Sequence, residues 1–216
     1  MKLGKRHIST SIVAKPESLA AAIERLTDDE AVALPFLAEA ARLELLATVR
    51  ALPFRTAPGK IGEGAREVGQ DFDICMAIPA DSPLHALRCV TSNVLQTAFA
   101  LIAPCPLSHK LQFNDVVVQR YAPGSAGISP HRDHLRYVGL VALVPLIGDA
   151  RFYVCSSRDV IGAREILADP GDLILMRAPG LHGRTDRPFH GLCAVMTERY
   201  SIGLRQDSTR NDGEGS

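Results

Sequence analysis

The chain has 216 residues, of which 46% are hydrophobic, and 24 basic residues balance 24 acidic ones. This length and apolar content allow one sizeable core, so we expect one domain. The balanced charge argues against a protein whose main task is gripping duplex phosphates, because such proteins carry a basic excess. Five scattered cysteines without a CxxC pair argue against a disulfide framework or a zinc site.

The segment from Met1 to Ile23 has no continuous apolar core, so it does not resemble a signal peptide. No stretch approaches the ~20 apolar residues of a membrane span. We therefore expect a cytoplasmic protein with reduced thiols and no membrane partner.

The first half of the chain predicts helices. Apolar residues recur at helical spacing over Phe36 to Leu52 and over Leu84 to Ile102, and Ser82 is placed to cap the second segment. Ser18 to Leu26 predicts a third, shorter helix. Between the two main helices, Arg55 to Asp73 contains four glycines and mixed charge. We expect a mobile loop there, with a lid over a site as one role for it.

The second half predicts strands, because short segments rich in Val, Ile, Leu or Tyr alternate with Pro-Gly or Gly-Asp turns. These segments are 111–121, 138–147, 151–155, 165–167, 172–176, 191–196 and 199–205. Helices followed by many short strands predict a mainly β protein with flanking helices (α+β), and a jelly roll is the natural core. We expect a single domain over 1–205, with a helical part at about 17–105 and the jelly roll at about 111–205. The polar residues 206–216 are expected to form a disordered tail.

A pair of potential metal ligands lies in the second half. His131 and Asp133 are two residues apart, so in an extended segment their side chains point to the same face. Two histidines and one carboxylate on one side of a metal leave positions open, which is typical of iron(II) oxygenases. A third ligand must therefore come from elsewhere in the chain.

His182 is the preferred third ligand, because it follows a predicted core strand and an Ala-Pro-Gly turn. His190 competes with it, since it also precedes a glycine, and His134 and His109 are weaker rivals. An isolated HxD tripeptide can equally be a surface histidine beside a capping aspartate.

Two arginines suggest an anionic ligand. If residues 199–205 form a strand, Arg199, Ser201 and Arg205 share one face, while the other face is apolar and should pack against the body of the protein. Arginines inside a barrel need anionic partners, which a small dicarboxylate would supply. Gln119 and Tyr121 form a further pair that could reach the same cavity. The alternative without a functional role is that residues 199–205 form a solvent-facing edge strand with two ordinary surface arginines.

Four motifs together resemble one protein family. Gln-Arg-Tyr-Ala-Pro-Gly (119–124), His-Arg-Asp (131–133), Leu-His-Gly (181–183) and Arg-Tyr-Ser-Ile-Gly-Leu-Arg (199–205) occur in the order of the AlkB-like branch of the Fe(II)/2-oxoglutarate dioxygenases. The resemblance covers roughly residues 111–206. The 17-residue distance from His182 to Arg199 looks like that branch and favours His182 over His190.

The resemblance implies a double-stranded β-helix with catalytic iron held by His131, Asp133 and His182. It implies that Tyr121, Arg199 and Arg205 hold 2-oxoglutarate, with Gln119 and Ser201 beside them, and that O2 is the oxidant. Gln119 stands where repair members have Asn. Leu135 and Ser201 depart from residues that those members use, so the nucleobase match is poor.

The resemblance implies hydroxylation of a C–H bond, with succinate and CO2 as co-products. We expect a small metabolite or an amino-acid-like substrate. The first alternative is an oxidative demethylase of nucleic acid, whose phosphates would meet a rim of basic residues. The second alternative is a non-catalytic jelly-roll binding module. The sequence does not predict an oligomeric state.

Overall fold

The computed structural model describes residues 12–210 of the chain. Three helices precede or interrupt the first strands: α2 (Pro16–Arg25), α3 (Glu39–Arg50) and α4 (Pro83–Phe99). The Ser82 side chain accepts a hydrogen bond from the Leu84 N–H, as expected of the residue that caps α4. All three helices confirm predicted segments, with ends shifted by a few residues.

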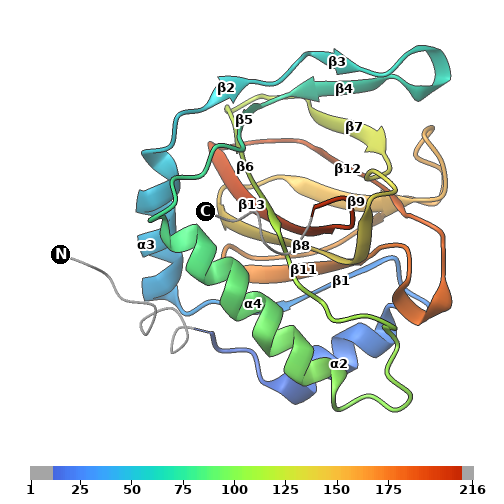
Figure 1. Ribbon diagram of the computed structural model, residues 1–216. Coiled ribbons are helices and arrows are strands. Elements are labelled where there is room, and N and C mark those ends of the chain that lie inside the picture. Colours follow the sequence, from blue (N-terminus) through green and yellow to red (C-terminus); the bar gives the residue numbers. More distant parts are fainter. Residues whose placement is uncertain (1–11, 211–216) are drawn as a thin grey trace.

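The strands form two antiparallel sheets that face each other (Figure 1). The seven-stranded sheet has the order β1 (Ala31–Pro35), β11 (Asp172–Arg177), β8 (Tyr137–Ile147), β13 (Arg199–Asp207), β6 (Asp115–Tyr121), β5 (Asp73–Cys75) and β2 (Arg55–Thr56). The six-stranded sheet has the order β10 (Arg164–Glu165), β9 (Arg151–Cys155), β12 (Phe189–Cys193), β7 (Gly127–His131), β4 (Val68–Asp71) and β3 (Lys60–Ile61). The predicted mainly β jelly roll with flanking helices is confirmed.

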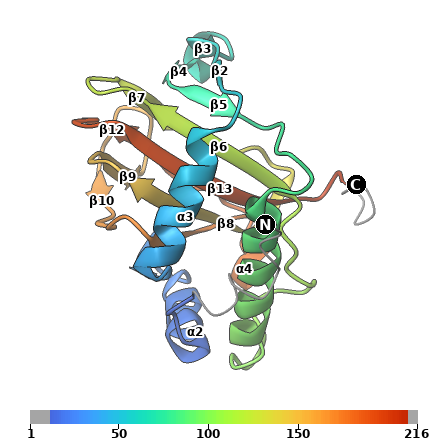
Figure 2. The same ribbon diagram turned by 90° about the vertical axis from the view of Figure 1, so that its left-hand side faces the viewer.

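The helices cover the outer face of the seven-stranded sheet (Figure 2). Leu45 of α3 and Leu87 of α4 are buried in the same cluster as Tyr200, Ile202 and Leu204 of β13. The apolar face predicted for residues 199–205 therefore packs against the helices. The other face of β13 points between the two sheets, as a period of two requires.

A second apolar cluster fills the space between the sheets. It includes Phe72, Tyr121, Phe152 and Met176, which come from both sheets or their connections. The interior of the jelly roll is thus a packed core, and only part of it is polar. That polar part is where most of the predicted site residues meet, with the exception of His182.

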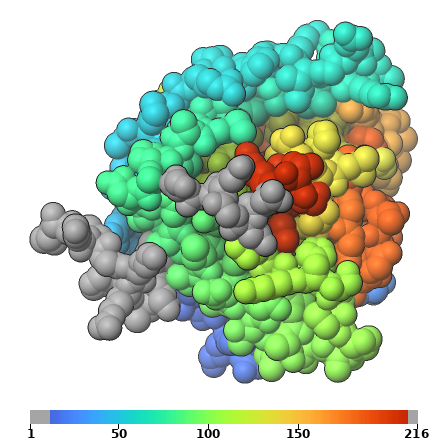
Figure 3. All heavy atoms as spheres, viewed as in Figure 1, coloured from blue at the N-terminus to red at the C-terminus, as the bar shows by residue number. Residues whose placement is uncertain are grey.

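Two segments differ from the sequence-based expectations. The expected loop at 55–73 contains the short strands β2, β3 and β4, with a 3-10 turn at Gly64–Arg66, and it forms the upper edge of the face seen in Figure 3. The expected tail begins too early at 206, because β13 continues to Asp207. Asp207 is only 2% exposed, and its carboxylate lies 3.1 Å from Arg136. The last part of the predicted tail, 211–216, lies outside the described residues.

No helix within residues 12–210 has the length and apolar character that crossing a bilayer requires.

Candidate metal centre

Three donor side chains meet between the sheets: His131, Asp133 and His190, whose ligand atoms all lie within 4.8 Å of one another. His131 ends β7, and Asp133 follows two residues later. His190 lies on the neighbouring strand β12, directly opposite His131, and the two ring centroids are 4.2 Å apart. The structure thus brings the predicted His131 and Asp133 together and adds His190.

His182 lies elsewhere, and its assignment as the third ligand is corrected here. It sits in the 3-10 turn Leu181–Gly183, with a left-handed backbone (φ 51°). Its Nε2 is 3.0 Å from the carbonyl oxygen of Ile23 and 3.3 Å from Oγ1 of Thr27, so the ring reaches towards helix α2. The physical reason is strand pairing: β12 pairs with β7, whereas the turn that carries His182 faces the helices.

Hydrogen bonds define which ring nitrogen each histidine of the group can offer. Nδ1 of His131 is 3.0 Å from the carbonyl oxygen of Ser129, and Nδ1 of His190 is 3.2 Å from that of Pro188. A carbonyl oxygen only accepts, so both Nδ1 atoms must carry the proton. Each Nε2 then has a free lone pair, which is the arrangement that metal-binding histidines adopt.

Burial keeps these imidazoles neutral. Burial, with a smaller contribution from His190, lowers the pKa of His131 to about 3. Burial also lowers the pKa of His190. Neutral imidazole is the form that binds a metal, so no proton has to leave either ring at neutral pH.

Asp133 supplies the negative charge. Burial acts to raise its pKa, but the adjacent Arg205 guanidinium acts against burial, and the pKa of Asp133 lies below its ordinary value. Its Oδ2 is 3.8 Å from Nε of Arg205, and neither atom has a hydrogen-bond partner among the described residues. Two neutral imidazoles and one ionised carboxylate with an unpartnered oxygen fit an iron(II) ion.

The polar residues predicted to hold a co-substrate line the same pocket. Arg199, Ser201 and Arg205 project from β13 towards the metal group. On β6, Tyr121 is paired with Arg199, and Gln119 with Ser201. The pairing of β6 with β13 explains why these two i, i+2 pairs, almost 80 residues apart, meet at one place.

Arg199 is a buried cation without an anionic partner. It is 6% exposed, and within residues 12–210 no carboxylate lies within ion-pair distance of its guanidinium. Burial lowers its pKa. Next to it, Tyr121 is 1% exposed, and burial raises its pKa to about 12, so the phenol keeps its proton as a hydrogen-bond donor. A buried guanidinium beside a phenol donor is suited to a carboxylate ligand.

The pocket around the metal group is narrow, with a volume of about 40 Å³. This volume corresponds to a few water molecules, since one water occupies roughly 10–15 Å³ on this measure. A five-carbon dicarboxylate needs more room, so its binding requires lining side chains to move. A much larger cavity, about 580 Å³, lies between helix α4 and the start of β6 and has Asp115 in its wall.

Comparisons with known proteins rest on the fold alone. No family model matches the sequence, and no curated protein matches it. A prolyl hydroxylase from Trichoplax adhaerens, solved with a hypoxia inducible factor peptide fragment, superposes with a TM-score of 0.63 at 13% identity, over 89% of this chain and 90% of that one. A 2OG-Fe(II) oxygenase family protein from Burkholderia pseudomallei gives 0.61 at 13% identity, over 88% and 90%. OsALKBH1 gives 0.56 at 14% identity, over 82% and 98%.

The chain therefore has the fold of the 2-oxoglutarate/Fe(II) oxygenases, and an AlkB homologue is among the structures it resembles. This finding confirms the double-stranded β-helix that the motifs implied. Identities this low carry no information on the substrate.

Proposed function

We propose that this protein is an iron(II)- and 2-oxoglutarate-dependent dioxygenase with His131, Asp133 and His190 as its metal ligands. The observation that carries the proposal is the convergence of two Nε2 lone pairs and one carboxylate oxygen within 4.8 Å, inside an oxygenase fold. A jelly-roll protein without metal chemistry would have no need of three neutral or anionic donors at one buried point.

Iron, when bound with 2-oxoglutarate and O2, supplies the oxidising chemistry that hydroxylates a C–H bond and releases succinate and CO2. In this proposal the protein binds and orients the reactants. Arg199 pairs with the distal carboxylate of 2-oxoglutarate, with hydrogen bonds from Tyr121, Gln119 and Ser201. Arg205, next to Asp133, lies beside the carboxylate nearer the metal.

A small metabolite or amino-acid-like compound is the substrate class we favour. The alternative, a nucleic-acid demethylase, needs a rim of free cations for phosphates. Several basic side chains that could form such a rim are already paired with acids: Lys60 with Glu67, Arg136 with Asp207, and Arg184 with Asp186. Arg132 packs against the Phe189 ring at 4.1 Å, which covers an aromatic surface that could otherwise stack with a base.

The function is tested by succinate formation from 2-oxoglutarate when O2 is admitted to anaerobically iron-loaded protein, with pooled metabolites or methylated oligonucleotides as substrates. Turnover stimulated by metabolites supports the proposal. Stimulation by oligonucleotides, with salt-sensitive binding to single strands, would favour the demethylase. Absence of turnover under all conditions, with iron bound, would favour the non-catalytic binding module.

The ligand set is tested separately by anaerobic titration with Fe(II) or Co(II). His190→Ala should weaken metal binding by more than about 100-fold, because loss of even an outer-shell partner typically costs 10–100-fold. His182→Ala is the matched control, since it removes a histidine only eight residues away that contacts helix α2. Retained affinity in His190→Ala and lost affinity in His182→Ala would reverse the assignment.

A further inference from the structure

Three charged side chains beside the metal group each leave a buried polar atom without a hydrogen-bond partner. Among residues 12–210 these atoms are Oδ2 of Asp115, Oδ2 of Asp133 and Nε of Arg205. An unpaired buried polar group is costly, so three of them in contact need a reason other than stability. Asp133 has such a reason in the proposed function, because its free oxygen binds the metal. Asp115 does not belong to the metal group and has no role yet.

The Arg205 guanidinium is shared between two carboxylates and forms a hydrogen bond with neither. Its Nη1 is 3.8 Å from Oδ2 of Asp115, and its Nε is 3.8 Å from Oδ2 of Asp133. Both distances allow Coulombic attraction, but they exceed the roughly 2.7–2.9 Å of a charge-assisted hydrogen bond. The centroid of the Tyr137 ring lies 5.0 Å from Cζ of Arg205, so the ring supports the guanidinium in this intermediate position.

Strand pairing fixes Asp115 beside Arg205. Asp115 begins β6 and is the partner of Arg205 in the register of β6 and β13, so both side chains point to the same side of the sheet. Asp115 is 2% exposed, and its other oxygen, Oδ1, lies 3.0 Å from Nη1 of Arg210. The short carboxylate is therefore held in place from behind, whereas the longer arginine side chain has more freedom to move.

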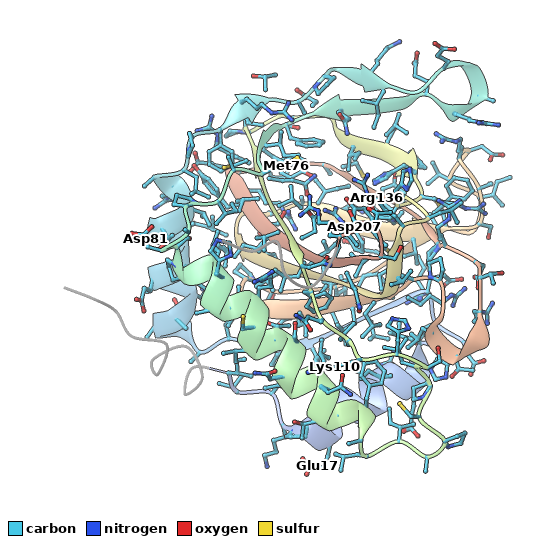
Figure 4. The ribbon with its side chains drawn as sticks, in the orientation of Figure 1. Glu17, Met76, Asp81, Lys110, Arg136 and Asp207 are labelled. Carbon is cyan, nitrogen blue, oxygen red and sulfur yellow. The ribbon has the colours of Figure 1, made fainter. Side chains whose placement is uncertain are left out.

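The network of alternating charges continues from Asp115 towards the surface. Nε of Arg210 lies 3.6 Å from Oδ2 of Asp207, and the same oxygen lies 3.1 Å from Nε of Arg136. Figure 4 shows Asp207 and Arg136 next to each other at the outer end of this network. The network anchors Asp115 to the end of β13 and to the segment before β8.

The metal needs the oxygen of Asp133 that a closed ion pair with Arg205 would occupy. A guanidinium with one carboxylate neighbour tends to close into a hydrogen-bonded pair, which is among the strongest polar contacts in proteins. Such a pair on Asp133 would engage the lone pairs that bind a metal and neutralise the charge of this ligand. The competing attraction of Asp115 opposes this closure, and it leaves Nε of Arg205 available to the co-substrate.

We propose that Asp115 is a positioning residue of the metal centre, which keeps Arg205 from closing onto Asp133. Asp133 then stays available to the metal, and Arg205 stays available to the co-substrate carboxylate nearer the metal. Asp115 is not itself a ligand, because it acts through Arg205. The inference rests on the proposed metal centre and adds to it a residue of the seven-stranded sheet.

Anaerobic titration of the full-length protein with Co(II), followed by visible absorption, tests the inference without turnover. Asp115→Asn should weaken Co(II) binding about tenfold, because the metal must then break a closed pair between Arg205 and Asp133. Asp73→Asn is the matched control. Asp73 also pairs with an arginine on β6, Arg120, at 2.7 Å, but on the outer face of the same sheet. Its loss should change the Co(II) affinity less than about twofold.

A double-mutant cycle shows whether Asp115 acts through Arg205. In an Arg205→Met background no guanidinium can close onto Asp133, so adding Asp115→Asn should change the Co(II) affinity less than about threefold. Arg210→Gln tests for a folding effect, since it also breaks the pair between Asp115 and Arg210 but leaves Asp115 free to attract Arg205. Arg210→Gln should bind Co(II) at least as tightly as the wild-type protein does.

Each outcome of these titrations decides between the inference and the metal centre. The inference is overturned, with the metal centre intact, if Asp115→Asn binds Co(II) as the wild-type protein does, or if it loses the same affinity in the Arg205→Met background. A tenfold loss in Arg210→Gln would also overturn it, because the common cause would then be the broken structural pair. Absence of Co(II) binding to the wild-type protein would refute the metal centre itself and the inference with it.

Discussion

Replacing Arg199 with methionine should make the metal-free protein more stable while abolishing its response to 2-oxoglutarate. Arg199 is 6% exposed and has no carboxylate partner in the described chain. Removing a guanidinium from water costs several kcal/mol, and here no anion of the protein offsets that cost. Methionine has a similar length and fills the same space without a charge.

The expected gain is about 2 kcal/mol, because replacing buried ionic groups by apolar ones of similar volume often stabilises proteins by roughly 1–4 kcal/mol. For a domain of about 200 residues this raises Tm by roughly 4–8 °C. Wild-type protein should gain a further ~2.7 kcal/mol at a 2-oxoglutarate concentration 100 times its Kd, whereas the variant should gain nothing.

Urea unfolding with and without 2-oxoglutarate measures both effects. Arg151→Met is the control, since Arg151 is an exposed arginine on β9 that pairs with Glu165, and its loss should change stability by less than about 0.5 kcal/mol. The reasoning is refuted if Arg199→Met lowers the free energy of unfolding by more than about 1 kcal/mol, or if 2-oxoglutarate still stabilises the variant. Either result would show that the Arg199 guanidinium is not an unpaired cation whose partner is the co-substrate.

Three further predictions concern stability. Burial raises the pKa of Tyr121 from 10.0 to about 12, so the unfolded chain releases the phenol proton at a lower pH than the folded protein does. The free energy of unfolding should therefore fall by up to about 2–3 kcal/mol between pH 10 and pH 12. Urea unfolding should show this loss in the wild-type protein and not in Tyr121→Phe. Gly127→Ala should cost several kcal/mol, because its φ is +79° and an added Cβ would lie 1.9 Å from the Leu192 carbonyl oxygen. Gly124→Ala, at φ +80° with open space around it, should cost only about 1–2 kcal/mol. If thermal unfolding shows that Gly124→Ala and Gly127→Ala lose the same stability, the steric reasoning is refuted. Asp207→Ala should cost about 1–3 kcal/mol, since it removes a buried carboxylate that accepts hydrogen bonds from the Thr209 N–H and hydroxyl and pairs with Arg136. An unchanged unfolding midpoint would show that this carboxylate does not hold the end of β13 in place.

Much of the site was predictable because its strands alternate clearly. In residues 199–205 the apolar face and the arginine face are distinct, and the structure places them against the helices and inside the jelly roll, respectively. Strand β7 was not predicted, because Gly-Ile-Ser-Pro-His has the composition of a turn. Its pairing with β12 and β4 on either side, rather than its own propensity, makes it a strand.

The third ligand could not be chosen from spacing. The distance from His182 to Arg199 matched a family pattern, but ligand geometry depends on which strands are neighbours, and pairing between β7 and β12 is a long-range property. A glycine follows both candidates, Gly183 after His182 and Gly191 after His190, so this local feature does not separate them. An added Cβ at Gly191 would lie 2.5 Å from the Tyr153 hydroxyl, so the strand is tightly packed at the ligand. The sequence shows this glycine but not the tyrosine that approaches it.

The two sheets divide the reactive centre between them. Both histidines belong to the six-stranded sheet, with Asp133 directly after one of its strands, whereas both arginines belong to one strand of the other. The residues that select the metal and the residues that select the co-substrate therefore lie on different sheets. A mutation in one sheet can change the affinity for the metal or for the co-substrate without changing the other affinity. A ligand that contacts residues of both sheets links the sheets to each other. Its binding should therefore reduce the motion of the two sheets relative to one another.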